Sequence, residues 1–142
     1  MHETNWTSSA AAFIHRHMLR VYIEDTDSGG IVYYANYLRF AERGRTEMLR
    51  AVGISHADMI ANYQLFLAVR HCEVDYLLPA KLDDTLVVES QVTKISGASL
   101  ILAQRICRDG MPLVTLVVTI VCINAAGRAT RLPDRLRQML AS

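Results

Sequence analysis

Residues 24–37 read Glu-Asp-Thr-Asp-Ser-Gly-Gly-Ile-Val-Tyr-Tyr-Ala-Asn-Tyr, so three carboxylates precede a glycine pair and an apolar, tyrosine-rich helix start. A glycine pair lets backbone N–H groups approach a ligand closely, and the first turn of a helix has unpaired N–H donors and a partial positive charge. Such a helix end can stabilise an oxyanion. Asp27 could then attack a carbonyl carbon or activate a water molecule beside it.

The same stretch is open to simpler interpretations. Asp, Ser and Gly are ordinary turn residues, so residues 25–30 taken alone are typical of a helix cap. Asp25, Asp27 and Gly30 also have the spacing of a calcium loop, but Asn36 stands where that loop needs a bidentate Glu. A phosphate-binding loop is excluded because both its glycine spacing and its Lys-Ser/Thr ending are missing.

A helical pattern follows the turn, extends to about Val52 and stops at Gly53, which suits a left-handed cap. One face of this helix is apolar and the opposite face is charged, so the helix has a face to bury. We expect the buried stripe to consist of Tyr37, Ala41, Gly44, Met48 and Ala51. Gly44 would permit close contact with a sheet, which offsets its low helix propensity.

The rest of the chain shows mainly the two-residue period of strands. The expected strands are Met18–Glu24, Leu65–Leu78, Thr85–Ile95, Ser99–Arg108 and Pro112–Asn124. Ser96-Gly97 and Asp109-Gly110 are hairpin signals. Short helices are expected at residues 55–62, with Ser55 as N-cap, and at residues 132–140. This order predicts an α+β fold, in which a curved antiparallel sheet wraps around one long central helix.

The composition predicts a single domain. The chain has 142 residues, 51% of them hydrophobic, and a net charge of +1. We expect a flexible extension at residues 1–17, a domain at residues 18–142, no integral membrane segment and no nucleic-acid partner. Three cysteines without metal spacing predict buried, reduced thiols and a cytoplasmic location. His15 and His17 lack a nearby acid or Cys, so no metal site is expected.

Residues 20–53, with their E-D-T-D-x-G-G-x-V-Y-Y-A-N-Y core and E-R-x-R-T-E-M-L-R continuation, resemble the 4-hydroxybenzoyl-CoA thioesterase family of hotdog-fold proteins. Within that family the chain is most similar to the acyl-CoA thioesterases associated with the Tol-Pal system. The resemblance implies hydrolysis of an acyl-CoA without a cofactor, by a homotetramer assembled from dimers. It implies that Asp27 is the catalytic carboxylate, that the N–H of Tyr34 polarises the thioester carbonyl, and that the substrate is bound by Gly30, Tyr33, Tyr37 and Lys94.

Two features depart from this family pattern. The Tol-Pal-associated members usually have His at position 34, whereas this chain has Tyr34, as the 4-hydroxybenzoyl-CoA enzymes do. Lys94 is the only cation in residues 94–99, where some relatives have an arginine-rich segment for the coenzyme A phosphates. The phosphate ligands therefore stay open among Arg70, Arg105, Arg108 and Arg128. Because the longer part of the motif matches the Tol-Pal-associated enzymes, we expect an aliphatic acyl group rather than 4-hydroxybenzoyl.

Other functions remain as alternatives. A dehydratase would normally pair the acid with a His, and residues 24–37 contain none. A non-catalytic interaction module of the cell-envelope machinery would have no need of Asp27. Glu47, on the long helix, is a reserve catalytic acid, although a surface ion pair is its expected role. The strand Leu113–Ile123 is apolar on both faces, and because one helix covers only one face, a second copy is expected on the other.

Overall fold

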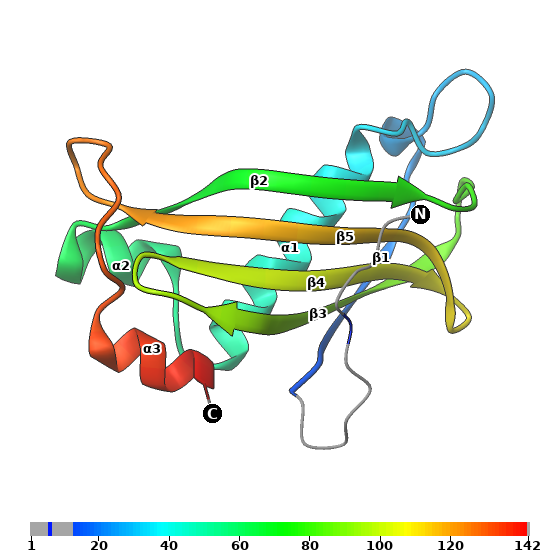
Figure 1. The fold of residues 1–142 in the computed structure, drawn as a ribbon. Helices are drawn as coiled ribbons and strands as arrows, with labels where there is room; N and C mark the ends of the chain where they lie inside the picture. Colours follow the sequence, from blue (N-terminus) through cyan, green and yellow to red (C-terminus); the bar gives the residue numbers. More distant parts are fainter. Residues whose placement is uncertain (1–5, 7–12, 142) are drawn as a thin grey trace.

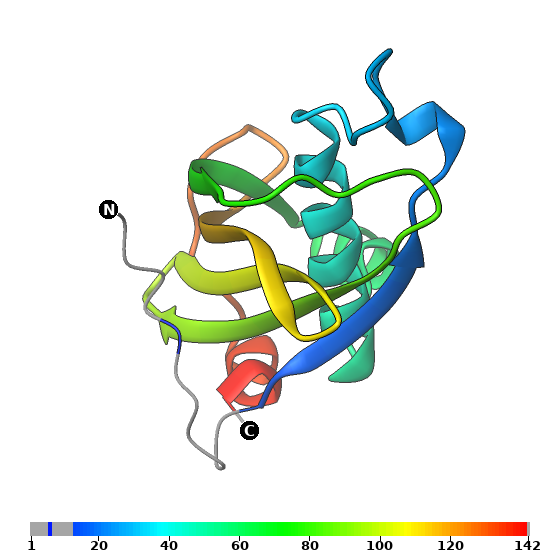
Figure 2. The same cartoon turned by 90° about the vertical axis from the view of Figure 1, so that its right-hand side faces the viewer.

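A computed structural model of the chain describes residue 6 and residues 13–141. Five strands form one antiparallel sheet in the order β1-β3-β4-β5-β2, and this sheet curves around helix α1 (Figures 1 and 2). The strands are β1 (His15–Arg20), β2 (Phe66–Tyr76), β3 (Thr85–Ile95), β4 (Ser99–Arg108) and β5 (Met111–Ile123). The helices are η1 (Ile23–Asp25, a 3₁₀ helix), α1 (Asn36–Ala51), α2 (His56–Tyr63) and α3 (Asp134–Ala141). The predicted α+β class is confirmed.

The three central strands are joined by tight turns, as the sequence predicts. β3 and β4 have the predicted bounds, and β5 differs from its predicted bounds by one residue at each end. Asp109 and Gly110, between β4 and β5, have φ angles of 51° and 79°. Two successive residues with positive φ make the turn type that matches the twist of a β-hairpin.

Helix α1 packs over β1, β3 and β4 and fills the concave side of the sheet. Its buried residues are Tyr37, Phe40, Ala41, Gly44, Met48 and Leu49. A Cβ on Gly44 would lie 2.4 Å from Val88 Cγ1, so the glycine allows the close approach that the sequence suggests. Ala51 was wrongly placed in the buried stripe: it is exposed because it is the last residue of the helix.

A polar network is buried between α1 and the sheet. Gln104, with no exposed surface, donates from Nε2 to the Ala41 carbonyl and to Ser90 Oγ, both at 2.9 Å. Its Oε1 accepts a hydrogen bond from Arg45 at 3.0 Å. Satisfied buried polar groups of this kind specify one arrangement of the core.

The first strand differs from its predicted bounds, Met18–Glu24. β1 begins earlier and ends at Arg20, and the 3₁₀ helix η1 follows it. The reason is local: Asp25 Oδ2 accepts from the Tyr22 N–H at 2.8 Å, and Thr26 Oγ1 donates to the Ile23 carbonyl at 2.7 Å. Short polar side chains of this type compete with the strand ladder and turn the backbone.

The predicted N-terminal extension is described only in part. Residues 1–5 and 7–12 lie outside the described residues, and β1 already begins at His15, which is paired with Ser90. The guanidinium carbon of Arg105 lies 3.9 Å from the Trp6 ring centroid, on the outer side of the sheet. The described residues contain no group of three or more His, Cys, Asp or Glu that would hold a metal.

Two expectations about burial need correction. Cys107 and Cys122 are buried, but Cys72 is exposed because it lies on the edge strand β2. On the outer face of β5, Val117 and Val121 are only 8% and 9% exposed in the single chain. The two apolar faces of this strand therefore do not by themselves require a second copy.

The short helices follow their capping signals. Ser55 Oγ accepts from the Asp58 N–H at 3.0 Å at the start of α2, as predicted. α3 begins at Asp134, directly after Pro133. None of the helices in the described ranges is long and apolar enough to cross a membrane.

Candidate active site

The acidic turn is closed by short-range backbone hydrogen bonds. The Asp27 N–H donates to the Ile31 carbonyl at 2.9 Å, and the Gly30 N–H donates to the Asp27 carbonyl at 3.2 Å. Gly30 has a φ of 83°, which glycine adopts without strain. The turn therefore presents Asp27 at a fixed place between η1 and α1.

Asp27 is exposed, and only one of its carboxylate oxygens is engaged. Oδ1 accepts from the Gly29 N–H at 2.7 Å, while Oδ2 makes no hydrogen bond to any described residue. The first contact orients the carboxylate, and the second oxygen is left for a ligand or a water molecule. A carboxylate in this state can act as a base or as a nucleophile.

The helix start presents a free donor. The Tyr33 N–H donates to the Asp25 carbonyl at 3.0 Å and the Asn36 N–H to the Tyr33 carbonyl at 2.8 Å. Between them, the Tyr34 N–H forms no hydrogen bond within the described part of the chain. It lies at the positive end of α1, where a partial negative charge on a ligand is stabilised.

The loop 77–84 supports this segment from the other side. The Val32 N–H donates to the Ala80 carbonyl at 2.9 Å, and Ile31 forms an isolated bridge with Lys81. The buried Tyr37 hydroxyl accepts from the Ala80 N–H at 2.9 Å. Burial, above all, raises the pKa of Tyr37. The predicted residue Tyr37 thus fixes the loop against the helix start.

An ion pair holds the far end of the same loop. Asp84 Oδ2 lies 2.6 Å from Arg108 Nη1 and also accepts from the Lys81 N–H at 2.8 Å. Desolvation pushes the pKa of Asp84 upward, but the Lys81 N–H and the Arg108 guanidinium outweigh it and hold this pKa below its usual value. The carboxylate therefore stays charged and keeps the loop in place.

A small aromatic pocket lies beside the free donor. Its volume is about 240 Å³, and its lining is almost entirely apolar: Ile31, Val32, Tyr34, Tyr37, Tyr76, Leu77, Leu78 and Pro79. The ring of Tyr76 meets Tyr34 edge-on, with centroids 6.1 Å apart, and lies 5.8 Å from Tyr37. We name this cavity the tyrosine pocket.

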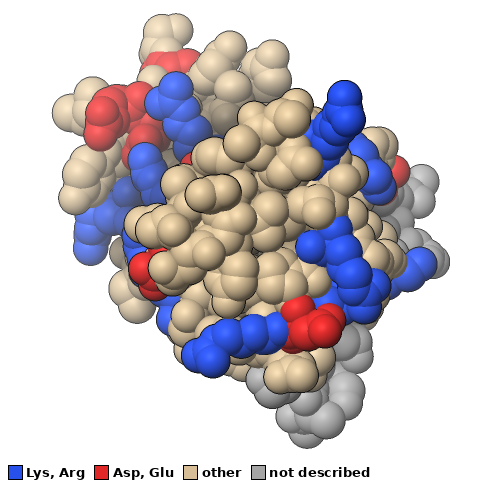
Figure 3. Space-filling view, turned by 90° about the vertical axis from the view of Figure 1, so that its left-hand side faces the viewer, with Lys and Arg blue, Asp and Glu red and all other residues tan. Residues whose placement is uncertain are grey.

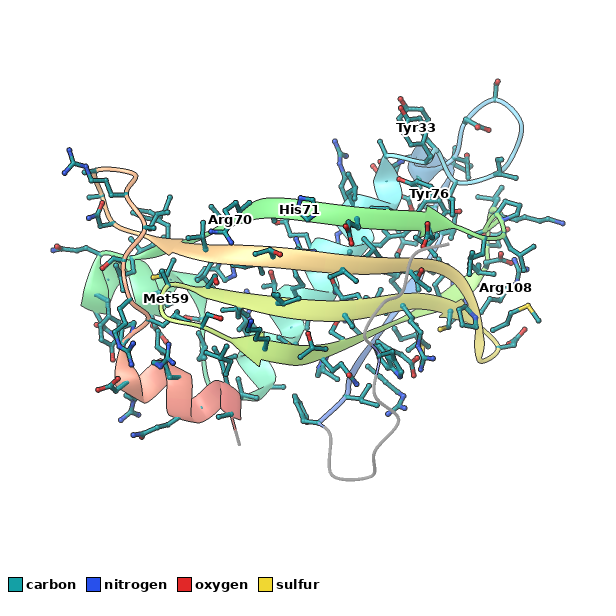
Figure 4. The ribbon with its side chains drawn as sticks, viewed as in Figure 1. Tyr33, Met59, Arg70, His71, Tyr76 and Arg108 are labelled. Atoms are coloured by element: carbon teal, nitrogen blue, oxygen red, sulfur yellow. The ribbon has the colours of Figure 1, made fainter. Side chains whose placement is uncertain are left out.

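Tyr76 is the site residue that the sequence did not reveal. It is the last residue of β2, and Figure 4 shows it at the same end of the molecule as Tyr33. Its aromatic ring at the end of a predicted strand was the only available signal. Desolvation raises the pKa of Tyr76, as expected for a phenol in an apolar pocket.

The predicted substrate-binding residue Lys94 and the reserve catalytic acid Glu47 do not lie at this site within one chain. Lys94 is near the end of β3, by the β3–β4 hairpin, at the opposite end of the sheet from the start of α1 (Figure 1). Glu47 pairs with Arg50 at 2.5 Å, so its expected surface ion pair is confirmed.

The four arginines considered as ligands of the coenzyme A phosphates differ in whether they already form an ion pair. Arg105 and Arg108 already form ion pairs, with Glu89 and Asp84. Arg70 and Arg128 are exposed and form no ion pair with a described residue. On the end of the molecule that carries α2 and α3, several Lys and Arg side chains surround a broad uncharged area (Figure 3).

Comparison with known families gives one match over most of the chain. Residues 21–140 match the thioesterase-like superfamily. The acyl-CoA thioesterase YbgC of Haemophilus influenzae is 42% identical over 106 residues, which cover 75% of this chain and 78% of that protein. The 1,4-dihydroxy-2-naphthoyl-CoA hydrolase of Nostoc punctiforme is 29% identical over 121 residues, which cover 84% of this chain and 82% of that protein.

Solved structures share the fold. A probable thioesterase from Bartonella henselae superimposes with a TM-score of 0.83 at 38% identity, over 85% of this chain and all of that one. A 4-hydroxybenzoyl-CoA thioesterase in complex with 4-hydroxybenzoyl-CoA gives a TM-score of 0.84 at 17% identity, over 89% of this chain and 98% of that one. Because the 4-hydroxybenzoyl-CoA thioesterase is only 17% identical, its similarity supports the fold alone.

Proposed function

The chain belongs to the thioesterase-like superfamily of hotdog-fold proteins, and from this membership we propose that it is an acyl-CoA thioesterase. Water and R-CO-S-CoA would yield the free acid and the thiol of coenzyme A. The observation that carries the proposal is the arrangement at the start of α1, where the exposed Asp27 carboxylate precedes a helix start with an unbonded Tyr34 N–H and an apolar pocket.

In the proposed mechanism the thioester carbonyl accepts a hydrogen bond from the Tyr34 N–H. Asp27 then either attacks the carbonyl carbon or removes a proton from the attacking water, and the helix end stabilises the oxyanion. The thiolate of coenzyme A leaves readily, so no Ser-His-Asp triad is needed. Gly29 supports this role because its N–H holds one carboxylate oxygen and leaves the other for the reaction.

The tyrosine pocket is the proposed acyl site. Tyr34 and Tyr37 form part of its wall, and the other proposed substrate-binding residues, Gly30 and Tyr33, are the chain neighbours of the lining residues Ile31 and Tyr34. The longer sequence match favours an aliphatic acyl group, whereas the edge-on packing of Tyr34 against Tyr76 favours an aromatic one. Lys94 remains a proposed phosphate ligand, which would have to act from another copy of the chain because it lies at the far end of the sheet.

Thiol release from butyryl-CoA, palmitoyl-CoA and 4-hydroxybenzoyl-CoA tests both the proposed hydrolysis and the preference for an aliphatic acyl group. We expect turnover, with a higher kcat/KM for an aliphatic substrate. A preference of about tenfold for the aromatic thioester, equal to about 1.4 kcal/mol of transition-state binding, would overturn the aliphatic assignment. Absence of thiol release from every substrate would instead favour a non-catalytic interaction module.

We also propose a homo-oligomer, a tetramer assembled from dimers, working in the cytoplasm. β2 is an edge strand of 11 residues with Phe66, Val69 and Tyr76 at least 39% exposed. A long exposed edge of this kind pairs readily with another strand. The cytoplasmic location is supported by three cysteines that form no disulfide.

A further inference from the structure

Asn36, the first residue of α1, reaches back to the acidic turn. Its side-chain nitrogen Nδ2 donates to the Asp25 carbonyl, eleven residues earlier in the chain, at 2.9 Å. An asparagine beside a helix start more often uses its side-chain oxygen to bind N–H groups of its own helix. Here the amide nitrogen joins the helix to a segment that precedes it.

The Asp25 carbonyl accepts a second hydrogen bond from the same helix start. The Tyr33 N–H donates to it at 3.0 Å. In the sequence the two donors flank Tyr34, whose N–H is unbonded within the described part of the chain. One carbonyl at the end of η1 is thus bonded on both sides of the proposed oxyanion donor. We name these two hydrogen bonds, from Tyr33 and Asn36 to Asp25, the Asp25 clamp.

The turn that carries Asp27 begins directly after this clamp. It is closed on itself, because the Asp27 N–H donates to the Ile31 carbonyl at 2.9 Å and Thr26 forms an isolated bridge with Val32. A closed turn of this kind moves as one unit. If the Asp25 clamp is loosened, the Asp27 carboxylate therefore shifts relative to the helix start.

We propose that Asn36 is a positioning residue: through the Asp25 clamp it sets the distance between the Asp27 carboxylate and the Tyr34 N–H. This inference rests on the proposed thioester hydrolysis. Asn36 is not among the residues that line the tyrosine pocket, so it acts on the reacting groups of the protein and not by contact with the acyl group. A displacement of about 1 Å can lower a rate by about 10²-fold, so one such hydrogen bond can control turnover.

Other contacts keep the turn folded when the Asn36 amide is removed. The Tyr33 N–H still donates to the Asp25 carbonyl, and the Asp25 side chain still accepts from the Tyr22 N–H. Asn36 itself is half-buried and does not belong to the buried residues of α1. Its replacement should therefore loosen the turn without opening the core.

Steady-state kinetics of Asn36→Leu test the proposal, with the acyl-CoA that wild type hydrolyses best. Leucine has nearly the shape of asparagine but no donor for the Asp25 carbonyl. We expect kcat to fall at least about tenfold and KM to change by less than about threefold, with a melting temperature close to that of wild type. Asn62→Leu makes the same change at an exposed position on α2, and this control should keep both constants.

Three results would overturn the positioning role. A kcat of Asn36→Leu within about threefold of wild type would show that the clamp does not control the reaction. A higher KM at unchanged kcat would make Asn36 a substrate-binding residue instead. If Asn36→Leu does not fold, Asn36→Ala replaces it, because alanine has the highest helix propensity. Failure of both variants to fold would make the contact a structural one.

Amide hydrogen exchange, followed by NMR, tests the clamp without any turnover. The Tyr33 N–H shares its acceptor with Asn36 and should exchange at least about tenfold faster in Asn36→Leu. The Leu102 N–H, on a strand paired on both sides, should not change. Unchanged exchange at Tyr33 would refute the clamp whatever the activity. If wild type releases no thiol from any acyl-CoA, the proposed hydrolysis fails and the catalytic effect of Asn36 with it, while faster exchange at Tyr33 would still show that Asn36 holds the turn.

Discussion

At the scale of single residues, Asp27 is distinguished by the different states of its two oxygens. Oδ1 is held by the Gly29 N–H, and Oδ2 is free of described partners. Asp25, two positions earlier, instead uses Oδ2 to bind the Tyr22 N–H and therefore shapes the turn. Two neighbouring carboxylates thus have different tasks, one in the proposed chemistry and one in the backbone.

Asp27→Asn should lower kcat by at least about 10²-fold, because the amide keeps the size of the side chain but is neither a base nor a nucleophile. The melting temperature should stay close to that of wild type. Thiol release from an acyl-CoA and a thermal melt measure the two effects. Asp83→Asn, on an exposed loop, is the matched control and should keep full activity. More than a tenth of wild-type activity in Asp27→Asn would contradict its assignment.

Tyr34→His should be tolerated, because the proposed role of this position belongs to its backbone N–H. The Tyr34 ring is 61% exposed and contacts only Tyr33 and Tyr76 among the described rings. We expect kcat/KM for the best aliphatic substrate to change by less than about threefold, in line with a surface substitution. A loss comparable with that of Asp27→Asn would mean that the side chain takes part in the chemistry.

At the scale of elements, the sequence correctly predicts the features that depend on residues close together in the chain. The Asp109-Gly110 turn, the Ser55 cap and the close approach at Gly44 are all set by residues near one another in the chain or by a single missing Cβ. The place of Tyr76 in the tyrosine pocket depends on which strand lies beside which helix, and no local pattern specifies that. The end of β1 was misplaced because the side chains of Asp25 and Thr26 outweigh strand propensity.

The loop 77–84 gives a pH-dependent prediction. Asp84→Asn should lower the free energy of unfolding by about 1 kcal/mol near neutral pH, since it removes the partly exposed ion pair with Arg108. The pKa of Asp84 is depressed in the folded state, so its contribution is present above the unfolded pKa and is lost as the pH falls through the folded value.

Urea unfolding at several pH values measures this contribution. The difference between wild type and Asp84→Asn should shrink as the pH falls below about 4, where the unfolded carboxylate begins to take up a proton. Asp109→Asn, an exposed acid outside this loop, serves as the comparison. A difference that grows toward low pH would have the wrong sign for a depressed pKa.

At the scale of the whole molecule, the edge strand β2 is the place to test the proposed assembly. Val118 and Ile120 belong to the core on the α1 side of β5, so charges placed there would unfold the chain rather than separate its copies. The informative position is on β2. Arg70 lies at a register irregularity between Val69 and His71 and has no Cα partner on β5.

Arg70→Pro should therefore dissociate the proposed oligomer and leave the single chain folded, because proline is tolerated at a bulge and blocks pairing at an edge. Light scattering should show an oligomer for wild type and for Arg70→Ala, and a monomer for Arg70→Pro, with similar circular dichroism for all three. A well-folded wild-type monomer at micromolar concentration would refute the assembly.

The strand order also has a consequence for how the chain folds. β3, β4 and β5 follow one another through tight turns, so this meander needs only short loop closures, whereas β1 and β2 reach the two edges through pairings between distant residues. Distant pairings form late because their loop-closure entropy is lost first. The turn that carries Asp27 follows β1 and rests on loop 77–84 after β2. We therefore expect the turn that carries Asp27 to assemble last and to open first, so that local unfolding there would abolish the proposed hydrolysis while the meander is still intact.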